Sequence, residues 1–236
     1  MQLLQWPSKA VIFGPSPIDW CEENWTSGIV AENHNTVTNA AYVLAAAALL
    51  ARHKSPLSGY ERSIFAYFCF SLLLTGLTSG LFHATLVWGA QKADETFENW
   101  TVLVLFHCTF ASISSQAIFR RICIHSLLVT LGIFLIPTIF CEVHLIFISF
   151  ATVYRFQLLE LDANERSLLG KTALYAAAGF GAWLCDFFAC NTFRNLYLHA
   201  YGWHILTAMA LYSAGLLLHS RLTKRPSSVV QDKKII

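Results

Sequence analysis

The sequence contains few charged residues. Asp, Glu, Lys and Arg together make up 13% of its 236 residues, whereas soluble domains carry about 25%. Hydrophobic residues make up 56% of the chain. So few charges cannot cover the surface of a water-soluble monomer. The composition therefore predicts a membrane protein.

Several other features are missing. No basic run is long enough to neutralise successive phosphates, and the net charge is only +2, which disfavours nucleic-acid binding. Residues 1–18 lack the apolar core of a cleavable signal peptide, so the first membrane helix must direct targeting. The seven cysteines form neither a CxxC pair nor a dense disulfide pattern. No repeat, low-complexity segment or long linker is present, which predicts one domain over residues 1–236.

Long apolar runs dominate the rest of the chain. Lipid cannot satisfy an open backbone, and about 20 helical residues cross the hydrocarbon layer, so each run favours a membrane helix. The sequence thus predicts an all-α, polytopic membrane protein, a bundle of seven transmembrane helices. The predicted spans are Val37–Ala51, Ile64–Trp88, Phe97–Ile118, Ile122–Phe140, Val143–Leu159, Ala173–Cys190 and Leu196–Leu218.

The basic residues predict the orientation of the bundle. With an odd number of spans and a lumenal amino terminus, 13 of the 16 basic residues fall on the cytoplasmic side, as the positive-inside rule requires. Residues 1–34 then form a lumenal segment and residues 220–236 a cytoplasmic tail. The cytoplasmic set is Arg52, Lys54, Arg62, Arg120, Arg121, Arg155, Arg166, Lys171, Arg221, Lys224, Arg225, Lys233 and Lys234; the lumenal set is Lys9, Lys92 and Arg194.

Ionisable and polar residues gather at one depth in this topology. Ionisable groups inside a membrane are costly and point to function. Six ionisable or polar residues within or beside the predicted spans fall in the lumenal leaflet: Ser79, His83, Asp94, Asp186, His199 and His204. Ser79 and His83 are four residues apart and share a helical face, and a turn over residues 89–93 is expected to fold Asp94, at the start of the third span, back towards them.

Three histidines with one open position are the ligand set of a catalytic zinc site. We therefore expect His83, His199 and His204 to bind Zn²⁺, with Asp94 as the general base and Ser79 as a hydrogen-bond donor to the oxyanion. Taken singly, each residue has a structural explanation: a histidine that links helices, a packing serine, a helix-capping aspartate. Histidines 53, 107, 125, 144 and 219 lie without matching partners in this scheme.

The segment DWCEEN supplies several oxygen donors in quick succession. They come from Asp19, the Trp20 carbonyl, Glu22 and Asn24, with Glu32 further on. Hard oxygen ligands suit Ca²⁺, in a structural or regulatory role. Two alternatives stay open: a solvated acidic loop, and glycosylation of Asn24, which begins the sequon Asn-Trp-Thr.

The chain resembles the alkaline ceramidase family. Four strings that follow the family's order carry the resemblance: DWCEEN with AEN and NTVTN, TSGLFHATLVWGAQKADE, CDFFAC, and LHAYGWHILT. The resemblance implies a seven-helix hydrolase of the endoplasmic reticulum or Golgi membrane that cleaves the amide of ceramide. It also implies the zinc and calcium ligands given above and a disulfide between Cys21 and Cys190. Asp186 is assigned a supporting role, orienting a histidine by a hydrogen bond.

The histidine spacing differs from the family pattern. The family's two histidines in the last helix are four residues apart, whereas His199 and His204 are five apart. In an α-helix at about 100° per residue, that spacing turns the two rings roughly 140° apart. A π-bulge would restore a common face. We therefore predict a bulge over Tyr201–Trp203, made easier by Gly202.

Two other functions fit the same residues. A related membrane hydrolase could act on another lipid, for example in the remodelling of GPI anchors, and a seven-helix receptor of the progestin and adipoQ kind could hold zinc for structure. The enzyme predicts chelator-sensitive release of fatty acid, and the receptor predicts a ligand-dependent signal. The expected partners are ceramide or a related lipid amide and membrane lipids, with no obligate protein partner.

Overall fold

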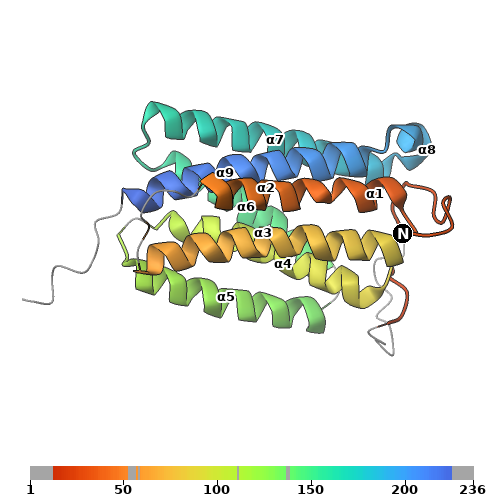
Figure 1. Cartoon of the computed structure of the whole chain (residues 1–236), viewed down its shortest axis with the longest axis horizontal. Coiled ribbons are helices and arrows are strands. Elements are labelled where there is room, and N and C mark those ends of the chain that lie inside the picture. Colours follow the sequence, from red (N-terminus) through yellow and green to blue (C-terminus); the bar gives the residue numbers. More distant parts are fainter. Residues whose placement is uncertain (1–12, 53–56, 58, 111, 137–138, 225–236) are drawn as a thin grey trace, which may run out of the picture.

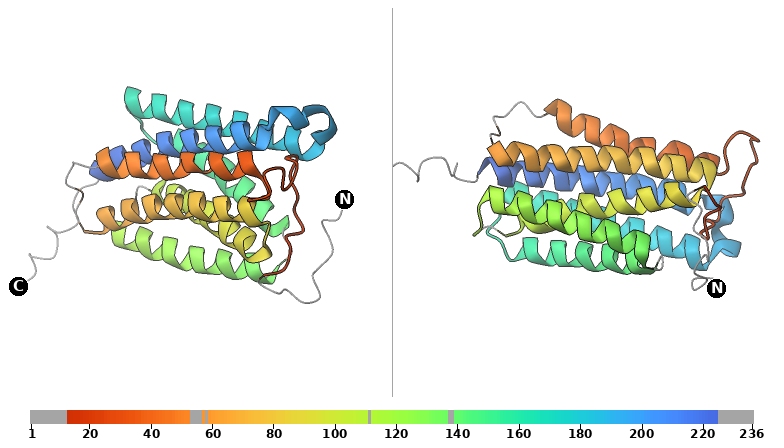
Figure 2. Two further views of the ribbon diagram at one scale, coloured as in Figure 1. Left: turned by 45° about the vertical axis from the view of Figure 1, so that its right-hand side comes forward. Right: turned by 90° about the horizontal axis from the view of Figure 1, so that it is seen from below.

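The computed structural model describes residues 13–52, 57, 59–110, 112–136 and 139–224. Within these residues the chain is helical, apart from turns and an isolated bridge between Pro15 and Val87. The long helices lie side by side along the long axis of the molecule (Figures 1 and 2). In chain order the helices are α1 (Asn33–Thr38), α2 (Ala40–Arg52), α3 (Gly59–Thr85), α4 (Trp88–Cys108), α5 (Ser115–Leu135), α6 (Ile139–Gln157), α7 (Ala163–Phe188), α8 (Cys190–Phe193), η1 (Arg194–Leu196), η2 (Leu198–His204) and α9 (Ile205–Thr223).

Helix α3 packs between α2 and α4, while α9 packs against α2 and α7. Helices α5 and α6 both contact α4. The start of α1, the carboxyl end of α3, the start of α4 and the short helix α8 all lie at the same end of the bundle (Figure 1). Segments far apart in the sequence therefore meet at this end.

The interior contains polar side chains as well as an apolar core. Phe68, Leu72 and Leu218 are fully buried in the main core. Large apolar side chains such as Leu128 and Phe147 face outwards. The polar residues that are buried include Thr75, Ser79, His83, Gln91, Asp94, Glu95, Asn99 and His204. An apolar exterior around a polar interior is expected when lipid, not water, surrounds the helices.

Three helices are long and apolar enough to cross a membrane: Gly59–Thr85, Ser115–Leu135 and Leu198–Thr223. A fourth is added if Ala163–Phe188 and the segment Cys190–Leu196, bent by 108°, count as one span. The other long helices in the described residues fall below this threshold. In α4, for example, the mean hydropathy is lowered by four buried polar residues: Gln91, Lys92, Asp94 and Glu95.

The prediction for the third span is wrong in its boundaries. The run Phe97–Ile118 crosses two elements, because α4 begins at Trp88 and ends at Cys108, and Ile118 lies in α5. The expected turn over residues 89–93 is helical, and the chain turns instead at Leu86, whose φ is 51°. The predicted span starts later than α4 does, because the first two turns of α4 carry buried polar residues and are not part of the apolar run. Asp94 consequently lies within the helix, not at its start.

Other helices begin earlier than their apolar runs. Helix α7 starts at Ala163, where Asp162 and Glu165 form a capping box, ten residues before the predicted span Ala173–Cys190. Lys9, His53, Lys54, Arg225, Lys233 and Lys234, and most of the predicted tail 220–236, lie outside the described residues.

Candidate metal centre

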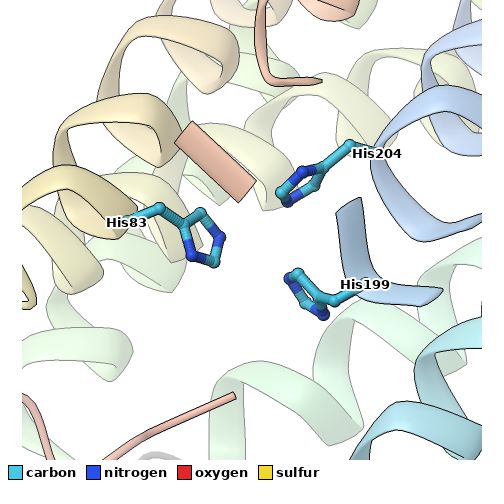
Figure 3. A group of neighbouring side chains, drawn as sticks. All are labelled: His83, His199 and His204. Carbon is cyan, nitrogen blue, oxygen red and sulfur yellow. The ribbon is translucent and has the colours of Figure 1, made fainter. Parts of the chain in front are cut away.

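Three histidine side chains converge at the end of the bundle where α3 ends. His83 comes from α3, and His199 and His204 come from η2 (Figure 3). One ring nitrogen of each lies within 4.8 Å of one ring nitrogen of the other two. All three residues are buried, with at most 4% of their surface exposed. The imidazoles predicted to share a cation are thus close together.

The π-helix η2 brings His199 and His204 to the same side. Residues Leu198–His204 form this π-helix, so the predicted bulge over Tyr201–Trp203 is confirmed, within a longer π segment. Hydrogen bonding from residue i to i+5 places residues five apart on one face. Tyr197, with φ 47°, precedes the segment in the left-handed region.

Gly202 allows η2 to approach α7 closely. A Cβ at Gly202 would overlap the Cβ of Ala182 on α7. Its φ lies outside the left-handed region, so the glycine serves close packing and not an unusual backbone angle.

Two of the rings have one nitrogen occupied by a hydrogen bond. His83 Nδ1 lies 2.5 Å from Glu32 Oε2, and His204 Nδ1 lies 2.8 Å from Thr38 Oγ1. These contacts leave Nε2 of each ring for a ligand. His204 Nε2 and His199 Nδ1 are buried without a hydrogen-bond partner. Buried, unpaired nitrogen atoms are costly, and neutral imidazoles oriented by outer hydrogen bonds suit Zn²⁺, so the donor set fits this ion.

Glu32 itself is fully buried at the start of α1. Burial raises the pKa of Glu32 to about 7, against the opposing effect of a hydrogen bond from the Asn35 side chain. Its second oxygen, Oε1, has no hydrogen-bond partner. Glu32 therefore depends on neighbouring donors, of which the His83 ring is the nearest.

His199 is positioned by contacts to its backbone and its ring face. Asp186 Oδ1 accepts a hydrogen bond from the His199 backbone N–H at 3.3 Å, and Oδ2 accepts one from the Cys21 N–H at 3.2 Å. The Trp20 ring stacks on the His199 ring, with 3.9 Å between the ring centroids. The hydrogen bond predicted between Asp186 and a histidine is made to the backbone of His199. The predicted disulfide between Cys21 and Cys190 is confirmed, and it links the segment before α1, which contains Trp20, to α8.

A cavity extends from the histidines towards α4. Ser79, His83, His199, His204 and Asp94 all line it, so the five residues predicted to act together surround one space. Ser79 and Asp94 are close enough to interact across this cavity, and Asp94 Oδ1 is buried without a hydrogen-bond partner.

The same cavity contains polar residues that the sequence analysis missed. Gln91, Glu95, Glu98 and Glu142 line it. Glu98 lies one helical turn after Asp94, and this spacing could have indicated a shared face. Glu142 comes from α6, and no spacing in the sequence relates it to α4.

Three histidines outside this site are also partnered, contrary to the prediction. His107 Nε2 lies 3.1 Å from His125 Nδ1, and the His125 and His144 rings are 5.5 Å apart. His144 Nδ1 lies 2.6 Å from Asn99 Oδ1. They come from α4, α5 and α6, and their contacts arise from helix packing, so each appeared isolated in the sequence.

The predicted calcium ligands lie around the start of α1. Glu22 accepts hydrogen bonds from the backbone N–H groups of His34 and Asn35, at 2.7 and 2.8 Å, and so caps α1. The Asn24 side-chain N–H donates to Asp19 at 2.9 Å. Asn24 Oδ1 and Glu32 Oε1 are buried and unpaired. Such orphaned oxygen atoms fit a hard cation.

These features define a class of protein, in which a helical bundle buries a three-histidine site suited to a metal beside a cavity lined with carboxyl groups. Comparison with known proteins identifies the family. The Ceramidase family model matches residues 14–231, and the chain belongs to this family.

Curated relatives agree with this assignment. An alkaline ceramidase of Drosophila melanogaster is 27% identical, over 85% of this chain and 75% of the relative. Alkaline ceramidase 3 of Mus musculus is 28% identical, over 85% of this chain and 82% of the relative. An alkaline ceramidase of Saccharomyces cerevisiae is 25% identical, over 84% and 73%.

Proposed function

We propose that this chain hydrolyses the amide bond of ceramide, or of a closely related lipid amide, with a catalytic zinc ion. The convergence of three buried imidazoles on a cavity that also contains Ser79 and Asp94, in a member of the ceramidase family, is the main support. The products are a sphingoid base and a fatty acid.

The histidines would hold the ion through the ring nitrogens that lack other partners. When bound, zinc supplies Lewis-acid chemistry, polarising a carbonyl group and making water more acidic. Glu32 and Thr38 fix the orientation of two of these rings through their Nδ1 atoms.

Asp94 is the general base and then the general acid in this proposal. Its carboxyl group faces the cavity with one oxygen unpaired. It takes a proton from the attacking water and returns it to the leaving amine. Ser79, one helical turn before His83 on α3, donates a hydrogen bond to the oxygen that becomes negative. Asp186 contributes by positioning His199 through its backbone.

We further propose one seven-helix domain that spans the membrane of the endoplasmic reticulum or Golgi, with the amino terminus in the lumen. The outward-facing apolar side chains and the distribution of basic residues support this topology. The Cys21–Cys190 disulfide favours a lumenal position for the site end, because the secretory pathway is oxidising.

A calcium ion at the start of α1 is a second part of the proposal. The ligands would be Asp19, the Trp20 carbonyl, Glu22, Asn24 and Glu32. The two unpaired oxygen atoms of Asn24 and Glu32 support it. Because Glu32 also contacts His83, an ion here would stabilise the segment that orients the zinc ligands.

The test is an assay of the purified protein in detergent with long-chain ceramides, measuring sphingoid base with and without a zinc chelator. We expect release of the base, its loss on chelation and its recovery with added Zn²⁺. His83→Ala should abolish turnover while the helical content is retained. Zinc binding without turnover of any lipid amide would favour a receptor, and turnover of another lipid only would favour a related hydrolase.

A further inference from the structure

Two carboxyl groups in the cavity have no role in the mechanism above. Glu98 on α4 and Glu142 on α6 both line it. Within the described residues, neither carboxyl group has a hydrogen bond or an ion pair, although Lys92 is close enough to Glu142 to interact with it electrostatically. Glu95, next to them, is different, because it accepts hydrogen bonds from Lys92 at 2.7 Å and from Gln91 at 2.5 Å. Glu98 and Glu142, like Asp94 Oδ1, are therefore acceptors left open in this cavity.

Glu98 lies beyond Asp94, further into the bundle, and Glu142 lies on α6, which packs against α4. Glu98 follows Asp94 by four residues on α4, which is about 6 Å along the helix axis and on the same face. Asp94, Glu98 and Glu142 are close enough to interact electrostatically. Helix α4 runs away from the histidine end, so Glu98 extends the polar wall from the proposed reaction centre inwards, and Glu142 lies close enough to Glu98 to interact with it.

A group of carboxyl groups inside a membrane bundle is costly unless hydrogen-bond donors reach it. The histidines provide separate evidence that the cavity binds a ligand, because His199 and His204 line it and their Nδ1 and Nε2 atoms, respectively, are buried without a hydrogen-bond partner. The cavity thus has a wall of open acceptors next to a wall suited to a cation. A ligand with several N–H and O–H donors near a reactive carbonyl group matches both walls, because its donors pair with the acceptors and its carbonyl oxygen suits the side that fits a cation.

We propose that Glu98 and Glu142 form a subsite that binds the hydroxyl groups of the amino-alcohol part of the substrate. This inference rests on the proposed function. In an amide of a long-chain amino diol, the two hydroxyl groups lie on carbons adjacent to the one that bears the nitrogen. With the carbonyl group near the histidines and the nitrogen near Asp94, these hydroxyl groups reach the next part of the wall, where Glu98 and Glu142 accept their hydrogen bonds. The two glutamates are positioning residues that select hydroxylated lipid amides.

The test compares ceramide with two analogues, one lacking the primary and one lacking the secondary hydroxyl group. Wild-type protein should turn over ceramide with a kcat/KM roughly 10- to 100-fold above that for at least one analogue, the range expected when a buried hydrogen-bonding group loses its partner. Glu98→Leu and Glu142→Leu should raise the KM for ceramide and narrow this ratio to within about threefold, with a smaller change in kcat.

Glu98→Gln and Glu142→Gln keep an acceptor oxygen of the same shape and should retain part of the preference. They also serve as the test if the leucine variants do not fold, with thermal unfolding as the check. Glu160→Gln, at an exposed position in the turn before α7, is the matched control and should leave the ratio unchanged.

Each outcome is decisive. An unchanged ratio in the folded leucine or glutamine variants would overturn the subsite. Equal cleavage of ceramide and both analogues by the wild-type protein would also overturn the subsite, although it would leave the proposed function intact. Wild-type protein that cleaves none of the three would refute the proposed function, and the subsite with it.

Discussion

Glu32 Oε2 and His83 Nδ1 lie 2.5 Å apart, and both side chains are almost completely buried. They join the start of α1 to the end of α3. The contact fixes which nitrogen of the His83 ring faces the other two histidines. It also links the predicted calcium ligands with the predicted zinc ligands.

We expect Glu32→Gln to weaken zinc binding by about 10- to 100-fold, the usual effect of losing an outer partner of a metal-binding histidine. The amide can still contact the ring, but the carboxylate charge that makes the imidazole more basic is lost. Zinc content after dialysis against a graded chelator measures the effect without an activity assay. Glu23→Gln, at an exposed position in the same segment, should bind zinc like the wild type. Equal zinc retention in both variants would show that Glu32 does not support the site.

Gly202→Ala should displace η2 from α7. The added methyl group would overlap Ala182 and cost about 1–3 kcal/mol of stability. A shift of about 1 Å at His199 and His204 is enough to lower kcat about 100-fold. Activity and thermal unfolding would be measured together.

The double variant Gly202→Ala/Ala182→Gly tests the reason for this effect. Removing the methyl group of Ala182 makes room for the new one, so most of the lost stability and activity should return. If the double variant is as impaired as the single one, backbone freedom at Gly202, and not its contact with α7, is what matters.

Replacing Cys21 and Cys190 by Ser should lower the stability of the protein by about 2–4 kcal/mol, because the disulfide closes a loop with a sequence separation of 169. Cys21 follows Trp20, which stacks on His199, so the activity should fall as well. Thermal unfolding with and without a reducing agent measures the loss. Cys123→Ser, at an exposed free cysteine, is the control and should not respond. Wild-type protein with two free thiols at these positions would contradict the prediction.

A pH-dependent contribution to stability is expected at the other end of the bundle. The Lys224 ammonium donates a hydrogen bond to Asp162 at 2.6 Å and lowers the pKa of this carboxyl group. Its stabilising effect is therefore present above the unfolded pKa of about 3.9 and is lost as the pH falls through the lower folded-state value. Asp162→Asn keeps a good amino-terminal cap for α7 and removes the charge.

The Asn variant should thus unfold at a slightly lower temperature than the wild type at pH 7, and the difference should vanish in strong acid. The effect is small because the pair is exposed. A difference that grows as the pH falls would have the wrong sign for this contact.

Several features of this protein followed from the sequence alone. Its all-helical structure follows from apolar runs too long for anything but helices in lipid. The common depth of His83, His199 and His204 was predicted from the order and direction of the spans. The π-bulge was predicted from the five-residue spacing, because the angle between two residues of one helix depends on local geometry alone. The pairing of Cys21 with Cys190 came from the family resemblance, since no spacing specifies a disulfide.

Only the tertiary structure decided which side chains from different helices meet. The predicted start of the third span lies after the true start of α4, because a sequence does not distinguish buried polar residues from solvated ones. Glu142 reaches the cavity, and His107, His125 and His144 contact one another, only because α4, α5 and α6 pack together. Packing also decided that it is the backbone of His199 to which Asp186 is hydrogen-bonded. Helix periodicity relates residues within one helix, while the rotation of one helix against the next is set by packing throughout the bundle.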